Sequence, residues 1–118
     1  MAVAGLFSNA KDRRNLTTGQ TVFEAGDAGN HMFGVVTGEI QLHDGERVVT
    51  TITPGGVFGE LALIDNVPRS LTAVASTDTV VAAIDRALFL YLISETPTFA
   101  LEVMTSMATR LRVLTEPA

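Results

Sequence analysis

The chain has 118 residues, no cysteine and a formal net charge of −5; this length suits one domain, residues 1–118, and the lack of cysteine excludes disulfides, thiolate metal sites and cysteine nucleophiles. The acidic balance argues against a nucleic-acid or membrane partner, because such binding depends on clustered Lys and Arg. No apolar run approaches the roughly 20 residues that span a bilayer, and the N-terminus lacks the pattern of a signal peptide, so we expect a cytoplasmic protein.

The first part of the chain, residues 1–15, is expected to be a lead-in with one or two helical turns around residues 6–12. From residue 16 to residue 84 the pattern changes to short β-like runs separated by turn residues. The expected strands are residues 21–23, 31–37, 39–43, 47–53, 71–75 and 79–84. Asp44-Gly45 is a hairpin signal, since both central positions of a type I′ turn require positive φ. This pattern predicts an antiparallel β jelly-roll barrel.

The last part, residues 85–116, is predicted to form C-terminal helices that flank the barrel. Asp85 is a candidate N-cap for a helix over residues 86–94, and Pro97 begins a second helix that must end near Glu116. The apolar residues of the second helix recur at spacings typical of one amphipathic face. They are Phe99, Val103, Met104, Met107, Leu111 and Leu114. This face either covers the barrel or pairs with another subunit, or it closes over a ligand.

Between two predicted strands lies the stretch 57–72, V-F-G-E-L-A-L-I-D-N-V-P-R-S-L-T. Gly59 can bring its backbone close to a ligand or adopt a left-handed turn. Residues 61–64 are a candidate for a one-turn apolar helix, whose first N–H groups carry partial positive charge. An anion is favoured at such a position.

The second half of this stretch supplies charge and hydroxyl groups. Pro68 pushes the chain out of the helix and directly into Arg69, whose planar and permanently charged fork suits phosphate oxygens. Ser70 adds a hydroxyl, and Glu60 can accept hydrogen bonds from sugar hydroxyls. The residues therefore predict a small site for an anion and a sugar.

The string F-G-E-L-A-L-I followed by P-R-S closely resembles the phosphate-binding cassette of cyclic nucleotide-binding domains. These domains serve catabolite-activator-type regulators, cyclic-nucleotide-dependent kinases and gated channels. The earlier string E-A-G-D-A-G-N-H-M-F-G-V-V-T-G-E-I is similar to the first hairpins of the same family. The resemblance implies a non-enzymatic regulatory module whose ligand is cyclic AMP, ahead of cyclic GMP.

The resemblance also implies roles for individual residues. Glu60 would accept a hydrogen bond from the ribose 2′-hydroxyl, while Arg69 and Ser70 would hold the cyclic phosphate. The C-terminal helix would cap the base through Leu111, Val113 or Leu114, with Thr115 or an arginine at the polar edge. The full set of expected ligand-binding residues is Phe58, Gly59, Glu60, Leu61, Arg69, Ser70, Leu71, Thr72, Leu111 and Leu114.

Three of the strand residues have two readings each. Leu71 stands where the family commonly has alanine, so its side chain either points into the core or narrows the phosphate pocket. Phe33 is a pocket wall or, as is more usual for an aromatic residue on a strand, part of the core. Thr72 is a polar ligand contact or a residue that pairs and packs within its strand.

Two other functions compete with the binding module. The first is a degenerate scaffold of the same family that acts as a protein-interaction module without nucleotide binding. The second is a cupin-like metal enzyme, which needs clustered histidines with a carboxylate. Because His31 and His43 lack the His-x-His spacing, we expect no metal, no cofactor and no catalytic residue. We further expect a stand-alone sensor that is a monomer or weak homodimer and acts through a possible separate effector protein.

Overall fold

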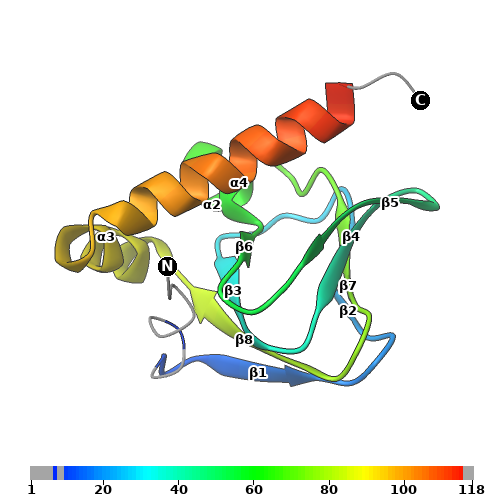
Figure 1. The fold of residues 1–118 in the computed structure, drawn as a ribbon, viewed down its shortest axis with the longest axis horizontal. Coiled ribbons are helices and arrows are strands. Elements are labelled where there is room, and N and C mark those ends of the chain that lie inside the picture. Colours follow the sequence, from blue (N-terminus) through cyan, green and yellow to red (C-terminus); the bar gives the residue numbers. More distant parts are fainter. Residues whose placement is uncertain (1–6, 8–9, 116–118) are drawn as a thin grey trace.

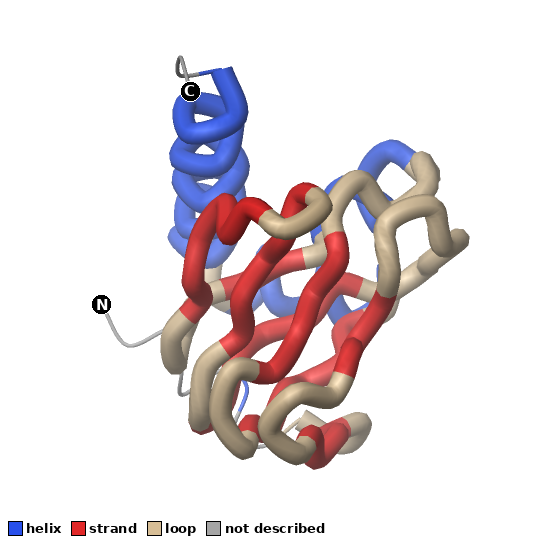
Figure 2. The backbone as a smooth tube through the Cα atoms, turned by 90° about the vertical axis from the view of Figure 1, so that its right-hand side faces the viewer, coloured by secondary structure: helices blue, strands red, loops and turns tan. Residues whose placement is uncertain are grey.

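The β-rich region of the computed structural model, which describes Phe7 and residues 10–115, consists of two four-stranded antiparallel sheets (Figures 1 and 2). The first sheet has the order β1 (Arg13–Leu16), β8 (Thr79–Ile84), β3 (Met32–Thr37) and β6 (Val57–Phe58). The second has the order β2 (Thr21–Phe23), β7 (Thr72–Ala75), β4 (Ile40–Asp44) and β5 (Arg47–Ile52). The antiparallel jelly-roll fold with C-terminal helices is therefore confirmed.

Three helices accompany the sheets. They are α2 (Glu60–Asp65), α3 (Arg86–Glu95) and α4 (Thr98–Thr115). Figure 1 shows α4 running along one side of the β-roll, with α2 beside its middle and α3 at its N-terminal end. None of the described helices is by itself long and apolar enough to cross a membrane; α3 and α4 meet the criterion only as a pair, which is bent by 119° at its junction.

Two hydrophobic clusters hold the domain together. The first lies between the two sheets and includes Phe33 and Phe58, whose rings stack with centroids 5.3 Å apart. The second lies between the first sheet and the helices and includes Ile84, Phe99 and Val103. Because successive residues of a strand point to opposite faces, β8 contributes to both clusters and is buried along most of its length.

The β-roll begins earlier than the sequence pattern indicates. We expected a lead-in up to residue 15, but β1 starts at Arg13 and pairs with β8. This edge strand is polar and exposed except for Leu16, so it lacks the alternation that marks a half-buried strand. The two-residue strand β6 was also missed, because it is too short to show a period. Of the expected helical turns at residues 6–12, residues 6, 8 and 9 lie outside the described residues, as does the expected helix end near Glu116, and residues 10–12 are not helical.

The hairpin between β4 and β5 is confirmed, but the expected turn type is wrong. Asp44 remains in the strand and pairs with Arg47, so the two-residue loop is Gly45-Glu46. Gly45 has φ 62°, whereas Glu46 does not have positive φ. A type I′ turn would need positive φ at both loop positions. The pairing of Asp44 with Arg47 therefore places the turn one residue later than expected.

The helical predictions agree with the structure at their N-terminal ends. The Asp85 carboxylate accepts a hydrogen bond from the Leu88 backbone N–H at 2.9 Å, which makes it the N-cap of α3. The second helix, α4, begins at Thr98, directly after Pro97. Its residues Phe99 and Val103 are buried against the first sheet, so this part of the apolar face covers the β-roll.

Candidate functional site

The site is built where β6 passes into α2. Gly59 connects them with φ 77°, a left-handed conformation that disfavours residues with a Cβ. A Cβ at this position would also lie 2.8 Å from Nη1 of Arg69. Glycine is thus required both for the turn and for the close approach of the arginine. The expected apolar helix over residues 61–64 is confirmed as part of α2.

Arg69 is only 7% exposed and its guanidinium is held by backbone carbonyls on both sides. Nη1 donates to the Gly59 carbonyl at 2.7 Å, and Nη2 donates to the His31 carbonyl at 2.8 Å. The guanidinium carbon lies 4.1 Å from the centre of the Phe23 ring. Nε is buried and has no hydrogen-bond partner within the described part of the chain. Burial lowers the pKa of Arg69, while the nearby charge of Asp27 raises it in part.

The backbone of Arg69 is also fixed, and the partner is the loop between β2 and β3. The Arg69 N–H donates to the Asp27 carbonyl at 2.8 Å, and the Gly26 N–H donates to the Arg69 carbonyl at 2.7 Å. Together with the bond to His31, these contacts join the arginine to a loop far away in the sequence. The orientation of Arg69 is therefore set by two segments that meet only in the folded domain.

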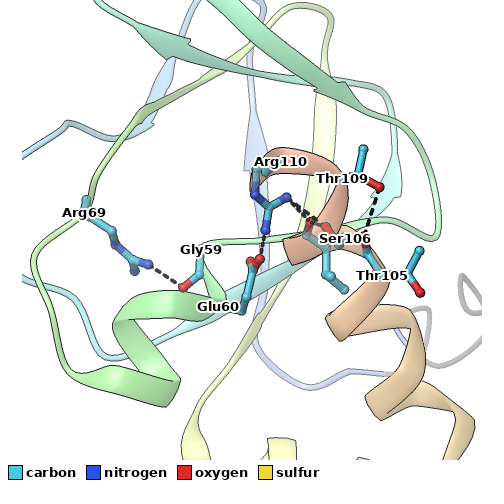
Figure 3. A network of polar contacts seen from close by, with 8 residues as sticks. Gly59, Glu60, Arg69, Thr105, Ser106, Thr109 and Arg110 are labelled. Carbon is cyan, nitrogen blue, oxygen red and sulfur yellow. Dashed lines mark hydrogen bonds and ion pairs between the residues drawn. The ribbon is translucent and has the colours of Figure 1, made fainter. Parts of the chain in front are cut away.

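Glu60 is the second buried charge of the site, with 1% of its surface exposed. Its carboxylate forms an ion pair with Nη2 of Arg110, which reaches down from α4 (Figure 3). Nη1 of Arg110 also donates to the Ser106 hydroxyl at 2.8 Å. Oε1 of Glu60 faces Arg110, whereas Oε2 has no hydrogen-bond partner among the described residues, so acceptor capacity remains at Oε2.

Arg110 keeps its charge at neutral pH despite this burial. Removal from water lowers the pKa of Arg110 to about 10, which is still well above neutrality. Arg110 therefore remains positively charged beside Glu60 at neutral pH. The ion pair joins the C-terminal half of α4 to the first residue of α2.

Two of the hollows that adjoin these charges are lined by Glu60. The smaller has a volume of about 40 Å³ and lies between α2 and the segment that carries Arg69 and Ser70. The larger, of about 260 Å³, lies between that segment and α4. Both are lined by Glu60, Leu61, Ser70, Leu71 and Arg110. The larger hollow is closed on its helical side by apolar side chains of α4, which are Met107, Ala108, Leu111 and Leu114.

Eight of the ten expected site residues border these hollows. Six of them lie around the smaller one, namely Gly59, Glu60, Leu61, Arg69, Ser70 and Leu71. Leu111 and Leu114 of α4 border the larger one. The stretch 57–72 and the C-terminal helix therefore meet at one place, although about forty residues of sequence separate Thr72 from Leu111.

Phe58 and Thr72 lie elsewhere. Phe58 is fully buried in the core between the sheets, because β6 directs its side chain toward Phe33. The Thr72 hydroxyl accepts a hydrogen bond from the Ala25 backbone N–H at 3.0 Å, which supports the strand reading of this residue. The core reading of Phe33 is confirmed by its 3% exposure. Leu71 is 8% exposed within the core cluster, and it also borders both hollows. It therefore belongs to the core and also lies beside the proposed pocket.

Two further residues of α4, Val113 and Thr115, do not border either hollow. Val113 packs partly against the core between the sheets, and its backbone carbonyl accepts a bond from Arg47 at 3.2 Å. The Thr115 hydroxyl donates to the Leu111 carbonyl at 2.9 Å within the helix. Their expected contacts with the base stay predictions. No group of three or more His, Cys, Asp or Glu in the described ranges is arranged to hold a metal ion.

Arg110 is the site residue that the sequence analysis did not identify. A basic residue of an amphipathic helix ordinarily belongs to the polar face. However, Arg110 follows Val103 by about two helical turns and therefore shares the buried face. A basic residue in that position is a signal for a buried acidic partner, but the sequence does not identify Glu60 as that partner.

Comparison with known proteins gives one family. A model of the cyclic nucleotide-binding domain matches residues 13–96. The cAMP-dependent protein kinase regulatory subunit of Eremothecium gossypii is 40% identical over 84 residues, which are 71% of this chain and 18% of that subunit. The cyclic AMP receptor protein of Thermus thermophilus is 37% identical over 105 residues, which are 85% of this chain and 49% of that receptor. The chain thus spans less than half the length of either relative.

A solved structure covers almost the whole domain. It comes from work on a cyclic-GMP-dependent signalling pathway that regulates bacterial phytopathogenesis, and it is 32% identical with a TM-score of 0.72. The alignment covers 99% of this chain and 93% of the other. The similarity therefore includes the β-roll, the cassette and the helix α4 that closes the larger hollow.

Proposed function

This chain belongs to the cyclic nucleotide-binding domain family, and we propose that it is a regulatory module that binds a cyclic nucleotide and catalyses no reaction. The ligand lies between the segment Gly59–Leu71 and helix α4 in this proposal. Two relatives of this chain are a kinase regulatory subunit and a receptor protein, and this similarity supports a regulatory role through ligand binding. In keeping with these relatives, we propose a cytoplasmic location and a separate effector protein.

The observation that carries the proposal is a pair of buried charges with unused hydrogen-bonding capacity beside one hollow. Arg69 has a buried Nε without a partner among the described residues, and Oε2 of Glu60 has no hydrogen-bond partner in the same part of the chain. Leaving such groups unsatisfied is unfavourable, so a ligand that satisfies both is stabilised. A cyclic phosphate next to Arg69 and a ribose hydroxyl next to Glu60 would do so.

The remaining residues have supporting roles in this proposal. Ser70 adds a hydroxyl donor for the phosphate, and Gly59 allows the close backbone approach. Apolar contacts to the base come from Leu61, Leu111 and Leu114, which border the larger hollow. Phe58 and Thr72 do not contact the ligand in this proposal. Phe58 stacks on Phe33 in the core, and Thr72 bonds the loop that supports Arg69.

Coupling between the ligand and α4 follows from the Arg110–Glu60 ion pair. A ribose hydroxyl that donates to Glu60 would share this carboxylate with Arg110, so the contacts of α4 would differ between the free and the bound states. A ligand shifts an equilibrium only if it interacts differently with the two states. We therefore propose that α4 is the element whose position reports binding, with its N-terminal half covering the β-roll and its C-terminal half closing on the ligand.

We infer a preference for cyclic AMP over cyclic GMP. The kinase regulatory subunit and the receptor protein are named for cyclic AMP, whereas the solved structure comes from work on a cyclic-GMP-dependent pathway. The base side of the larger hollow is mainly apolar, so packing rather than hydrogen bonding would dominate recognition of the base.

The second candidate is a scaffold of the same fold that has lost its ligand and binds a protein. One observation favours it: Arg110 already neutralises Glu60, and Leu71 already fills part of the space beside the hollow. Isothermal titration calorimetry with cyclic AMP, cyclic GMP and the non-cyclic control 5′-AMP separates the two candidates. We expect the cyclic nucleotides to bind and 5′-AMP to bind more weakly. If neither cyclic nucleotide binds at high micromolar concentration, the binding module is wrong and the scaffold remains.

A further inference from the structure

Gly29, in the loop between β2 and β3, lies directly against the guanidinium of Arg69. A Cβ built at Gly29 would be 2.5 Å from Nε, 2.5 Å from Nη2 and 2.6 Å from Cζ of Arg69. Gly29 does not have the left-handed backbone conformation that favours glycine, unlike Gly26 in the same loop. The obstacle to a larger residue at Gly29 is therefore the arginine side chain and not the backbone.

The guanidinium of Arg69 has little room to move. It is planar, 7% exposed, and bonded on opposite sides to the carbonyls of Gly59 and His31. One of its faces is covered by the Phe23 ring. A methyl group at Gly29 would displace it from at least one of these contacts, because a separation of 2.5 Å is far inside van der Waals contact.

We propose that Gly29 is a positioning residue for Arg69. Its lack of a side chain leaves the space in which the Nε–Nη2 edge of the guanidinium lies, so that the arginine bridges the β2–β3 loop and Gly59. Gly29 lies outside the cassette and borders neither of the two hollows, so its effect on a ligand there passes through Arg69. The packing relationship stands on the geometry alone, whereas its effect on ligand binding rests on the proposed function.

A stability cycle without ligand tests the packing relationship. The variants are Gly29→Ala, Arg69→Ala, the double variant, and Ala28→Ser as a control that adds one heavy atom at an exposed neighbouring position. We expect Gly29→Ala to lower the urea midpoint in the presence of Arg69. In the Arg69→Ala background the same change should raise it, because the clash is gone and alanine restricts the unfolded chain more than glycine.

The outcome that overturns the proposal is an equal effect of Gly29→Ala in both backgrounds. If the single variant fails to fold, folding of the double variant supports the proposal, and failure of both refutes it. A second readout is the Nε–Hε signal of Arg69 in a nitrogen–proton NMR spectrum. Gly29→Ala should move this signal and Ala28→Ser should not; an unchanged signal in Gly29→Ala also refutes the positioning role.

Ligand affinity is the third readout. We expect Gly29→Ala to weaken cyclic AMP binding by about tenfold or more, because a displaced guanidinium loses a charge-assisted hydrogen bond to the phosphate. Ala28→Ser should keep the wild-type affinity. If the wild-type domain binds no cyclic nucleotide, the proposed function fails, but the stability cycle and the NMR signal still decide whether Gly29 positions Arg69.

Discussion

Arg110 of α4 and Glu60 of α2 form an ion pair in which the two side chains are 11% and 1% exposed. A buried pair of this kind stabilises a fold less than its proximity suggests, because both charges lose their hydration. Removing one partner is nevertheless strongly destabilising, since the other charge remains buried without compensation. The pair therefore makes the attachment of α4 sensitive to any change at Glu60.

The first prediction concerns this attachment. Arg110→Ala should lower the free energy of unfolding by about 3 kcal/mol, because it leaves the Glu60 carboxylate buried without its partner. Urea denaturation measures the change. Arg112→Ala, at an exposed position of the same helix, is the matched control and should stay within about 0.5 kcal/mol of the wild type. Equal effects of the two substitutions would contradict a structural role for the buried pair.

The second prediction concerns the phosphate. Arg69→Ala should weaken cyclic AMP binding by about 1.5 to 3 kcal/mol, the range for loss of a hydrogen bond to a charged group. Arg86→Ala removes the same charge at an exposed position of α3 and serves as the control. Calorimetry of the two variants separates a local contact from a general effect of net charge. A similar loss in both variants would mean that only long-range attraction is involved.

The sequence predicts those parts of the fold that depend on local signals. The ends of β2 and β8 are found where alternation and turn residues place them, and the cap at Asp85 is found as expected. The strand β1 was missed because an exposed edge strand carries no apolar alternation. The turn type at Asp44 was wrong because Asp44 stays in the strand and pairs with Arg47, and such a pairing is a property of two strands that the dipeptide Asp44-Gly45 does not show.

In the candidate site, too, the sequence predicts the features that depend on one short stretch and misses those that depend on contacts between distant segments. The cassette motif identifies Glu60 and Arg69, because their spacing lies within one short stretch. Their partners are not local: Arg69 is held by the Asp27 and His31 carbonyls, and Glu60 is paired with Arg110. These contacts depend on how loops and helices pack after folding. A sequence pattern can therefore indicate candidate functional charges without indicating which contacts fix them in place.

The third prediction concerns the acid side of the stability profile. The carboxylate of Asp78 accepts hydrogen bonds from the backbone N–H and the hydroxyl of Thr18, both at 2.9 Å. These bonds, the backbone bond first, lower the pKa of Asp78 below its ordinary value of 3.8. Since the folded state prefers the charged form, this contribution to stability is present above pH 3.8 and is lost as the pH falls through the folded pKa.

An NMR titration of the Asp78 carboxyl group tests this assignment. Thr18→Val removes the hydroxyl donor and keeps the backbone donor, so the pKa of Asp78 should rise only part of the way toward 3.8. Thr17→Val, whose hydroxyl faces Gln20 instead, is the control and should leave the titration unchanged. A full return to the ordinary value in Thr18→Val would show that the backbone bond has no effect.

The fourth prediction addresses Leu71, which belongs to the core and also borders both hollows. Leu71→Ala should cost about 2 to 5 kcal/mol of stability, the usual range for removing a buried leucine side chain. The same change widens the space beside Ser70, so cyclic AMP affinity should be at least that of the wild type. Denaturation and calorimetry on the same sample give both quantities. A loss of affinity beyond about tenfold would mean that Leu71 is itself a required ligand contact.

The fifth prediction tests whether α4 closes on the ligand. Leu111 is 65% exposed but borders the larger hollow, whereas Leu101 is 60% exposed on the same helix and does not border it. Leu111→Ala should weaken cyclic AMP binding by about fivefold, because a ligand that covers part of this side chain gains roughly 1 kcal/mol from its burial. Leu101→Ala should not change the affinity. Neither substitution should alter the urea midpoint appreciably, since both side chains are largely exposed without ligand. If the two variants bind equally well, the ligand does not reach α4, and the helix serves only to cover the β-roll.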